Sequence, residues 1–156
     1  MSQPGAKAAE QIAAANLKVM VIDDSNTIRR SAEIFLGQAG YRVVLAEDGF
    51  DALAKIADHQ PDLIFCDILM PRLDGYQTCA LIKKSPRFSD IPVVMLSSKD
   101  GLFDRARGRM VGSEQYLTKP FTKETLLKEV AERARKLHEQ RAGAASSSVS
   151  TPATVD

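Results

Sequence analysis

The chain has 156 residues, a length that suits one domain of ordinary size with additional end segments. Its formal net charge is +1, so the global charge indicates neither a nucleic-acid binder nor an acidic tail. Two cysteines, Cys66 and Cys79, are too few for a disulfide framework, and their apolar surroundings indicate buried free thiols in a reducing cytosol. The sequence has neither the ~18 consecutive apolar residues of a membrane span nor a secretory leader, which favours a cytoplasmic protein without membrane insertion.

Both ends of the chain lack the bulky apolar side chains that a core requires. Residues 1–16 are rich in Ala and Gln, and we expect a flexible N-terminal segment there. Residues 141–156 are mostly Ala, Ser and Thr, a composition typical of a disordered tail. The folded domain is therefore expected over 17–140, and the tail is too short to form a separate effector domain.

Short apolar runs, rich in β-branched residues, alternate with segments of helical periodicity between these ends. In chain order the runs cover 18–22, 42–46, 63–66, 92–96 and 115–118. They predict strands that are covered on both faces. Five β-α alternations predict an α/β fold, a parallel sheet with helices on both sides.

Each helical segment carries its apolar residues on one face. In chain order these stripes are Ile28, Ala32, Phe35, Leu36 and Ala39, then Ala52, Leu53 and Ile56, then Cys79 and Ile82, then Leu102, Ala106 and Met110, and finally Leu126, Leu127, Val130, Ala134 and Leu137. We expect Gly40 to end the first helix, and Asp48 and Thr122 to cap the second and the fifth.

Reactive side chains follow four of the five predicted strands. They are Asp23 and Asp24 after the first, Asp67 after the third, Ser97 and Ser98 after the fourth, and Lys119 after the fifth. Ligands of doubly wound sheets bind beyond the carboxyl ends of the strands, so these side chains are expected to converge. Three carboxylates there would repel one another unless a hard cation such as Mg²⁺ neutralised them. Any single Asp could merely cap a helix, and only the combination indicates a site.

The segments around these residues resemble the motifs of response-regulator receiver domains. They read Val-Ile-Asp-Asp-Ser at 21–25, Cys-Asp-Ile-Leu-Met-Pro-Arg-Leu-Asp-Gly at 66–75, Met-Leu-Ser-Ser at 95–98 and Tyr-Leu-Thr-Lys-Pro-Phe at 116–121. The resemblance covers about residues 17–137 and implies the doubly wound (βα)5, CheY-like fold, with a five-stranded parallel sheet in the order 2-1-3-4-5. Three further segments, 48–56, 75–83 and 97–104, resemble PilG-type regulators of type IV pilus twitching motility.

The resemblance implies a phosphorylation site. Asp67 would take a phosphoryl group from the phosphohistidine of a CheA-type histidine kinase. Mg²⁺ would be held by Asp24, Asp67 and the backbone carbonyl of Leu69, with Asp23 acting mainly through water. Lys119 would pair with another phosphoryl oxygen, and its peptide bond to Pro120 is expected to be cis. Beyond this self-phosphorylation and self-dephosphorylation we expect no enzymatic activity.

A switch is also implied. A phosphoryl group adds about −1.5 to −2 charge, and Ser97 would turn inward to donate to it, which vacates space into which Tyr116 rotates in this family. The face formed by the helices near 102–110 and 122–137 and the strand at 115–118 would then bind a downstream protein of the pilus machinery. We expect a monomer or a phosphorylation-dependent dimer, and no nucleic-acid partner. Taken singly, Tyr116 could be a core residue, Ser97 a turn hydroxyl and Lys119 a surface charge.

Other function classes fit the residues less well. A haloacid-dehalogenase-type phosphohydrolase needs Asp-x-Asp, whereas Leu69 stands two residues after Asp67. A flavodoxin-like binder would bring the FMN phosphate against Asp23 and Asp24. A phosphate sink or relay receiver without an output surface stays open as the alternative. Because Leu69 cannot orient water and Lys99 adds positive charge, slow self-dephosphorylation is expected.

Overall fold

A computed structural model gives the structure of residues 16–98 and 105–150. Its strands are β1 (Lys18–Ile22), β2 (Arg42–Ala46), β3 (Leu63–Asp67), β4 (Val93–Ser98) and β5 (Gln115–Lys119). Its helices are α2 (Asn26–Gln38), α3 (Gly49–His59), α4 (Gly75–Lys84), α5 (Arg105–Met110) and α6 (Lys123–Ser150). All strand pairs are parallel and the sheet order is β2-β1-β3-β4-β5, which confirms the predicted fold and strand order.

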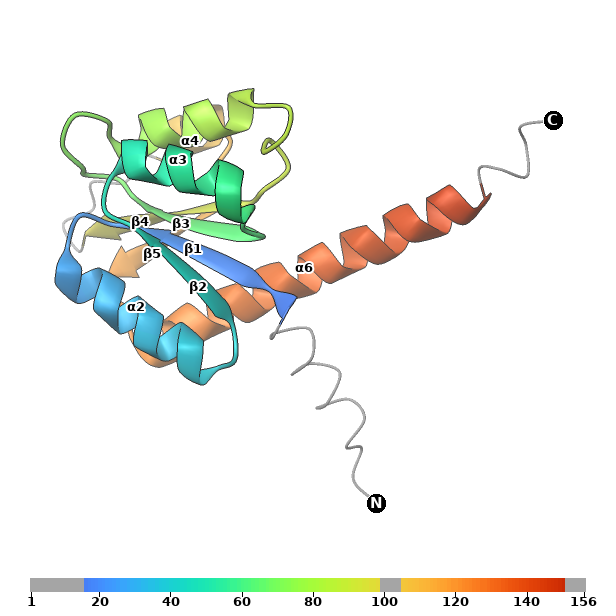
Figure 1. Cartoon of the computed structure of the whole chain (residues 1–156), viewed down its shortest axis with the longest axis horizontal. Coiled ribbons are helices and arrows are strands. Elements are labelled where there is room, and N and C mark those ends of the chain that lie inside the picture. The colour runs from blue at the N-terminus through green and yellow to red at the C-terminus, as the bar shows by residue number, and fades with distance from the viewer. Residues whose placement is uncertain (1–15, 99–104, 151–156) are drawn as a thin grey trace, which may run out of the picture.

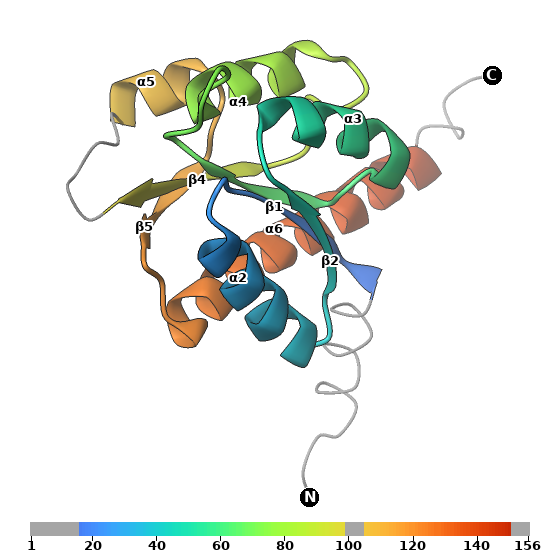
Figure 2. The ribbon, with the colours of Figure 1, turned by 60° about the vertical axis from the view of Figure 1, so that its left-hand side comes forward.

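The sheet separates two helical layers. Helices α3, α4 and α5 cover one face, while α2 and α6 cover the other (Figures 1 and 2). Alternate residues of one strand enter different cores: Met20 and Ile22 pack under α3 and α4, and Val19 and Val21 pack against α2 and α6. Because both faces of the central strands are covered, β3 is buried along its whole length. This explains the continuous apolar runs of the sequence.

The helix ends follow local chemistry. The Asp48 carboxylate accepts a hydrogen bond from the Asp51 amide at 2.7 Å, and the Thr122 hydroxyl accepts one from the Thr125 amide at 3.1 Å. Both predicted caps are therefore confirmed. Gly40, with φ of +92°, lies just beyond α2, in the left-handed region that favours glycine.

Two expectations were wrong. Helix α6 continues to Ser150, so the expected boundary at 140/141 lies inside a helix rather than at the start of a disordered tail. The residues directly after Gln140 include several alanines, which propagate a helix that is already nucleated. Ala106 and Met110 were expected to face the core, but both are exposed, Met110 at 86%, because α5 is only six residues long and buries Gly108 instead. Leu102, from the same expected stripe, lies outside the described residues.

Helix α6 also buries an ion pair that the apolar pattern did not indicate. The Nε atom of Arg133 lies 3.0 Å from Oε2 of Glu129, and both side chains are largely buried. Within residues 16–98 and 105–150, no helix combines the length and hydropathy that a bilayer span requires.

Candidate functional site

The carboxyl edge of the sheet gathers the charged residues that the sequence placed after the strands. Asp23 follows β1 directly and Asp67 is the last residue of β3, so the two neighbouring strands bring their carboxylates together. Strand order reverses at this point of the sheet, which is where doubly wound folds bind ligands. Asp23 is fully buried and Asp67 is 2% exposed, whereas Asp24 is exposed to solvent.

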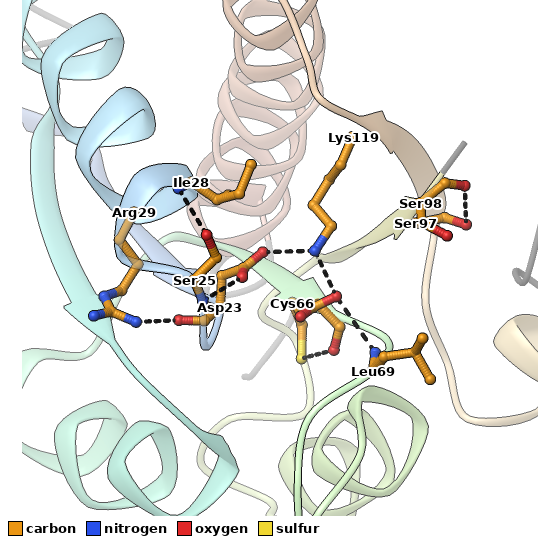
Figure 3. A network of polar contacts seen from close by, with 10 residues as sticks. Asp23, Ser25, Ile28, Arg29, Cys66, Leu69, Ser97, Ser98 and Lys119 are labelled. Atoms are coloured by element: carbon orange, nitrogen blue, oxygen red, sulfur yellow. Dashed lines mark hydrogen bonds and ion pairs between the residues drawn. The ribbon is translucent and has the colours of Figure 1, made fainter. Parts of the chain in front are cut away.

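Lys119 joins the two buried carboxylates. It ends β5, and its Nζ atom lies 3.0 Å from Oδ2 of Asp23 and 2.9 Å from Oδ1 of Asp67 (Figure 3). The Lys119–Pro120 peptide bond is cis, as expected. The two short distances place the ammonium group at the ends of β1 and β3, with the Lys119 side chain only 17% exposed, where it can reach an anion bound to Asp67.

The start of α2 fixes Asp23. The Ser25 amide donates to Oδ1 of Asp23 at 2.9 Å, and the Arg29 guanidinium donates to the Asp23 carbonyl (Figure 3). The Ser25 hydroxyl in turn caps α2 by accepting from the Ile28 amide at 3.3 Å. The Ser25 amide and the Arg29 guanidinium thus hold Asp23 in addition to its ion pair with Lys119.

The three aspartates form a candidate metal centre. One carboxylate oxygen from each of Asp23, Asp24 and Asp67 can be chosen so that all lie within 4.8 Å of one another. Oxygen-only donors of this charge suit a small hard cation, and Mg²⁺ is the simplest choice. The exposed Asp24 leaves one side of the cluster open to solvent, so an ion can enter and retain water ligands.

Burial perturbs the ionisation of these groups. It raises the pKa of Asp67 to about 7, with the charge of Asp23 adding to the rise and the hydrogen bond from Lys119 opposing it. Burial also raises the pKa of Asp23, against the opposing effects of the Ser25 amide and Lys119. Burial alone would lower the pKa of Lys119, but its bonds to Asp67 and Asp23 raise it. A bound cation would favour the ionised form of Asp67 that the protein by itself disfavours.

The loop after Asp67 depends on a glycine. A Cβ atom at Gly75 would lie 2.2 Å from the carbonyl oxygen of Asp67, so only glycine allows α4 to begin this close to β3. Asp74 caps α4 in a reciprocal capping box with Gln77. Asp74 and Gly75 therefore both have structural roles at the start of α4.

Arg72 ties this loop to α3. Its guanidinium lies 3.0 Å from the carboxylate of Asp48 and 5.5 Å from the ring centroid of Phe50. Arg72 has a φ of +69°, unusual for a residue with a side chain. Its position in the 66–75 motif gave no signal of this contact, because the partners follow a different strand.

The two expected switch residues lie on β4 and β5. Ser97 is buried, and its hydroxyl donates to the Ser98 carbonyl at 3.3 Å (Figure 3). Tyr116 is half-buried and its hydroxyl accepts a hydrogen bond from Arg105 at 2.8 Å, so it is more than a core residue. The sequence did not predict the contact of Arg105 with Tyr116, because the two residues belong to different elements. Leu69 is 58% exposed next to Asp67, and Lys99 lies outside the described residues.

Comparison with known proteins agrees with this geometry. The sequence matches the response regulator receiver domain family over residues 19–131. Protein PilG of Pseudomonas aeruginosa is 71% identical over 111 residues, which cover 71% of this chain and 82% of that protein. The response regulator MprA of Mycobacterium sp. (strain KMS) is 38% identical over 111 residues, and the chain there spans 47% of the relative's length.

Solved structures give the same fold. The chemotaxis protein CheY4 of Vibrio cholerae superposes with a TM-score of 0.71 at 34% identity, covering 74% of this chain and 97% of that chain. The receiver domain of the Francisella response regulator 1452 superposes with a TM-score of 0.70 at 32% identity, covering 78% of this chain and 99% of that chain. With its sheet order and its aspartate cluster, the chain therefore belongs to the response regulator receiver domain family, and its sequence is of the PilG type.

Proposed function

We propose that this protein is a cytoplasmic response regulator that accepts a phosphoryl group on Asp67 from a CheA-type histidine kinase and signals by phosphorylation-dependent protein binding. One observation carries the proposal: Lys119 bridges two buried carboxylates that form a metal-sized cluster with a third. Phosphoryl transfer requires little covalent work from a protein beyond a positioned nucleophile and charge neutralisation, and these groups supply both.

Transfer of the phosphoryl group forms one bond and breaks one bond. A carboxylate oxygen of Asp67 bonds to phosphorus as the P–N bond to the kinase histidine breaks, and the imidazole leaves with that electron pair. Asp67 must be ionised to attack, and its pKa of about 7 leaves a substantial neutral fraction near neutral pH. Mg²⁺ held by Asp24, Asp67 and the Leu69 carbonyl, with Asp23 acting through water, would neutralise charge on the reacting oxygens.

Lys119 then changes partner. Before transfer its ammonium group pairs with Asp23 and Asp67. After transfer the Asp67 carboxylate has become an acyl phosphate, and Lys119 pairs with a phosphoryl oxygen while keeping Asp23. The Ser97 hydroxyl turns from the Ser98 carbonyl toward another phosphoryl oxygen.

The resulting movement is the signal. Ser97 vacates space for Tyr116, and the face made by α5, β5 and α6 changes shape. Moving such a switch from mostly off to mostly on takes about 5 kcal/mol of differential interaction, which contacts to a hydroxyl, an ammonium and a metal together can supply. By similarity to PilG-type regulators, the partner of this face belongs to the type IV pilus machinery. No turnover is expected beyond the protein's own phosphorylation and dephosphorylation.

The test is intact mass after incubation with acetyl phosphate, with and without Mg²⁺, beside Asp67→Asn. We expect a Mg²⁺-dependent, hydroxylamine-labile gain of one phosphoryl group that the variant lacks. Absence of the adduct together with absence of beryllofluoride binding would refute the phosphorylation proposal. For the cellular role, wild type but not Asp67→Asn should restore twitching to a Pseudomonas aeruginosa strain lacking PilG; restoration by both would refute phosphorylation-dependent output.

A further inference from the structure

The Arg105 side chain, at the start of α5, holds Tyr116 by two different contacts. Its Nη2 atom donates a hydrogen bond to the Tyr116 hydroxyl at 2.8 Å. Its Cζ atom also lies 5.1 Å from the centroid of the Tyr116 ring, within cation–π range. One guanidinium therefore engages both the hydroxyl and the face of the same ring, in the partly exposed position that the ring occupies here.

The strand register links this tyrosine to the phosphorylation site. Tyr116 of β5 pairs with Met95 of β4, and it packs against the core that contains Met95. Ser97 lies two residues after Met95, so its side chain is on the same face of β4, one step nearer to the carboxyl edge. Space released by movement of Ser97 toward a phosphoryl group thus opens on the side of the sheet that Tyr116 already faces.

The Arg105 side chain is free to move away from Tyr116, and α5 has other contacts with the domain. Arg105 is exposed and lies between two surface hollows, of about 500 and 350 Å³, that both it and Tyr116 line. Helix α5 is attached separately by Arg107, whose guanidinium lies 4.3 Å from the Tyr76 ring centroid and 3.8 Å from the Asp74 carboxylate. The contact between Arg105 and Tyr116 is therefore not the sole attachment of α5 among the described residues, and its loss would leave the contacts of Arg107 in place.

We propose that Arg105 is a latch that holds Tyr116 in its partly exposed position. It thereby sets how much energy phosphorylation at Asp67 must supply to move the ring inward. The inference rests on the proposed function. Contacts made by only one of two states stabilise that state, and this energy opposes any ligand that favours the other state. Removing the guanidinium should thus favour the inward ring and strengthen the binding of a phosphoryl analogue at Asp67. From one hydrogen bond and one cation–π contact near the surface, we expect a gain of about 3- to 10-fold.

The sign of the effect separates a latch from simple electrostatics. Arg105→Met removes a positive charge, and loss of positive charge by itself weakens the binding of an anion. A latch predicts the opposite, tighter binding. Arg109→Met is the matched control. Arg109 lies on the same helix, is exposed and lines the smaller hollow, and within the described residues it makes no ion pair or ring contact.

The experiment is calorimetric titration of the full chain with beryllofluoride in excess Mg²⁺. We expect the Kd to fall about 3- to 10-fold in Arg105→Met and to stay unchanged in Arg109→Met. In a Tyr116→Phe background, which lacks the hydroxyl, the effect of Arg105→Met should shrink. An unchanged or raised Kd in Arg105→Met, or an equal gain in Arg109→Met, would overturn the latch. If wild type bound no beryllofluoride at all, the proposed function itself would fall, and this inference with it.

A second readout follows the ring directly. The chain has three tyrosines, so fluorotyrosine labelling gives few ¹⁹F resonances, and Tyr116→Phe assigns the one of interest. In ligand-free Arg105→Met this resonance should shift toward its beryllofluoride-bound position. A resonance that stays at the wild-type position would contradict the latch, even if the affinity changed.

Discussion

Replacing Asp67 with asparagine is expected to stabilise the metal-free protein. The Asp67 side chain is almost fully buried, and burial raises its pKa from 3.8 to about 7. Because the pKa of Asp67 is higher in the folded state than in the unfolded state, Asp67 stays largely protonated in the folded protein between about pH 4 and pH 7, whereas in the unfolded chain it is ionised. The contribution of Asp67 to the free energy of unfolding is therefore greatest below about pH 4, falls as the pH rises to about 7, and stays low above it.

The magnitude follows from the shift. About three pKa units correspond to roughly 4 kcal/mol at 1.36 kcal/mol per unit. Because this shift already includes the stabilising effect of Lys119 on the ionised carboxylate, the asparagine variant should be more stable by up to about 4 kcal/mol at pH 8 and by almost nothing at pH 4. Urea denaturation in EDTA at both pH values measures it. Asp90→Asn, which removes an exposed carboxylate, is the control and should change stability by less than about 0.5 kcal/mol.

The same denaturation experiment in Mg²⁺ tests whether Asp67 is a metal ligand. Saturating Mg²⁺ should stabilise the wild type by mass action, and this gain should largely vanish in Asp67→Asn, since one ligand has lost its charge. Parallel pH profiles for wild type and Asp67→Asn in EDTA would refute the reasoning, because Asp67 would then not be the group whose ionisation burial opposes.

Three further changes have predicted outcomes. Lys119→Met should destabilise the metal-free protein by about 2–3 kcal/mol in urea denaturation, since it leaves two buried carboxylates unpaired, and Mg²⁺ should restore most of the loss; indifference to Mg²⁺ would contradict this. Gly75→Ala should cost about 2–4 kcal/mol, because its Cβ would overlap the Asp67 backbone, whereas Gly143→Ala, with open space around it on α6, should be neutral or stabilising. Equal effects at the two glycines would refute the steric argument. Leu69→Asn should hasten loss of the phosphoryl group, followed by intact mass, because an amide can orient the attacking water that an exposed leucine cannot; an unchanged rate would count against it.

Features set by neighbouring residues were predictable from the sequence. The caps at Asp48 and Thr122 depend on hydrogen bonds that span three residues, and the apolar runs of the strands reflect a sheet covered on both faces. The convergence of Asp23, Asp67 and Lys119 also followed, since parallel strands place their carboxyl ends at one edge.

Predictions failed where propensity and packing compete. The spacing of Met110 predicted that it would lie on the buried face of its helix. The six-residue helix α5 instead buries Gly108 and leaves Met110 exposed. Glu129 and Arg133 are polar by composition, but the direction of α6 buries them as a pair. The residues after Gln140 suggested disorder, although as a continuation of α6 they need no new nucleation.

The amino-acid sequence was enough to predict which chemical groups meet at one edge of the sheet, because parallel strands place their carboxyl ends together, whereas the order of the strands was implied by the family resemblance. Which atoms come into contact depends on the tertiary packing. Lys119 pairs with carboxylates 96 and 52 positions away, and Arg105 lies over the ring of Tyr116 from a different element. Such contacts depend on ångström-scale distances between side chains from separate elements, and these distances are set by how the helices pack on the sheet, which no local pattern records.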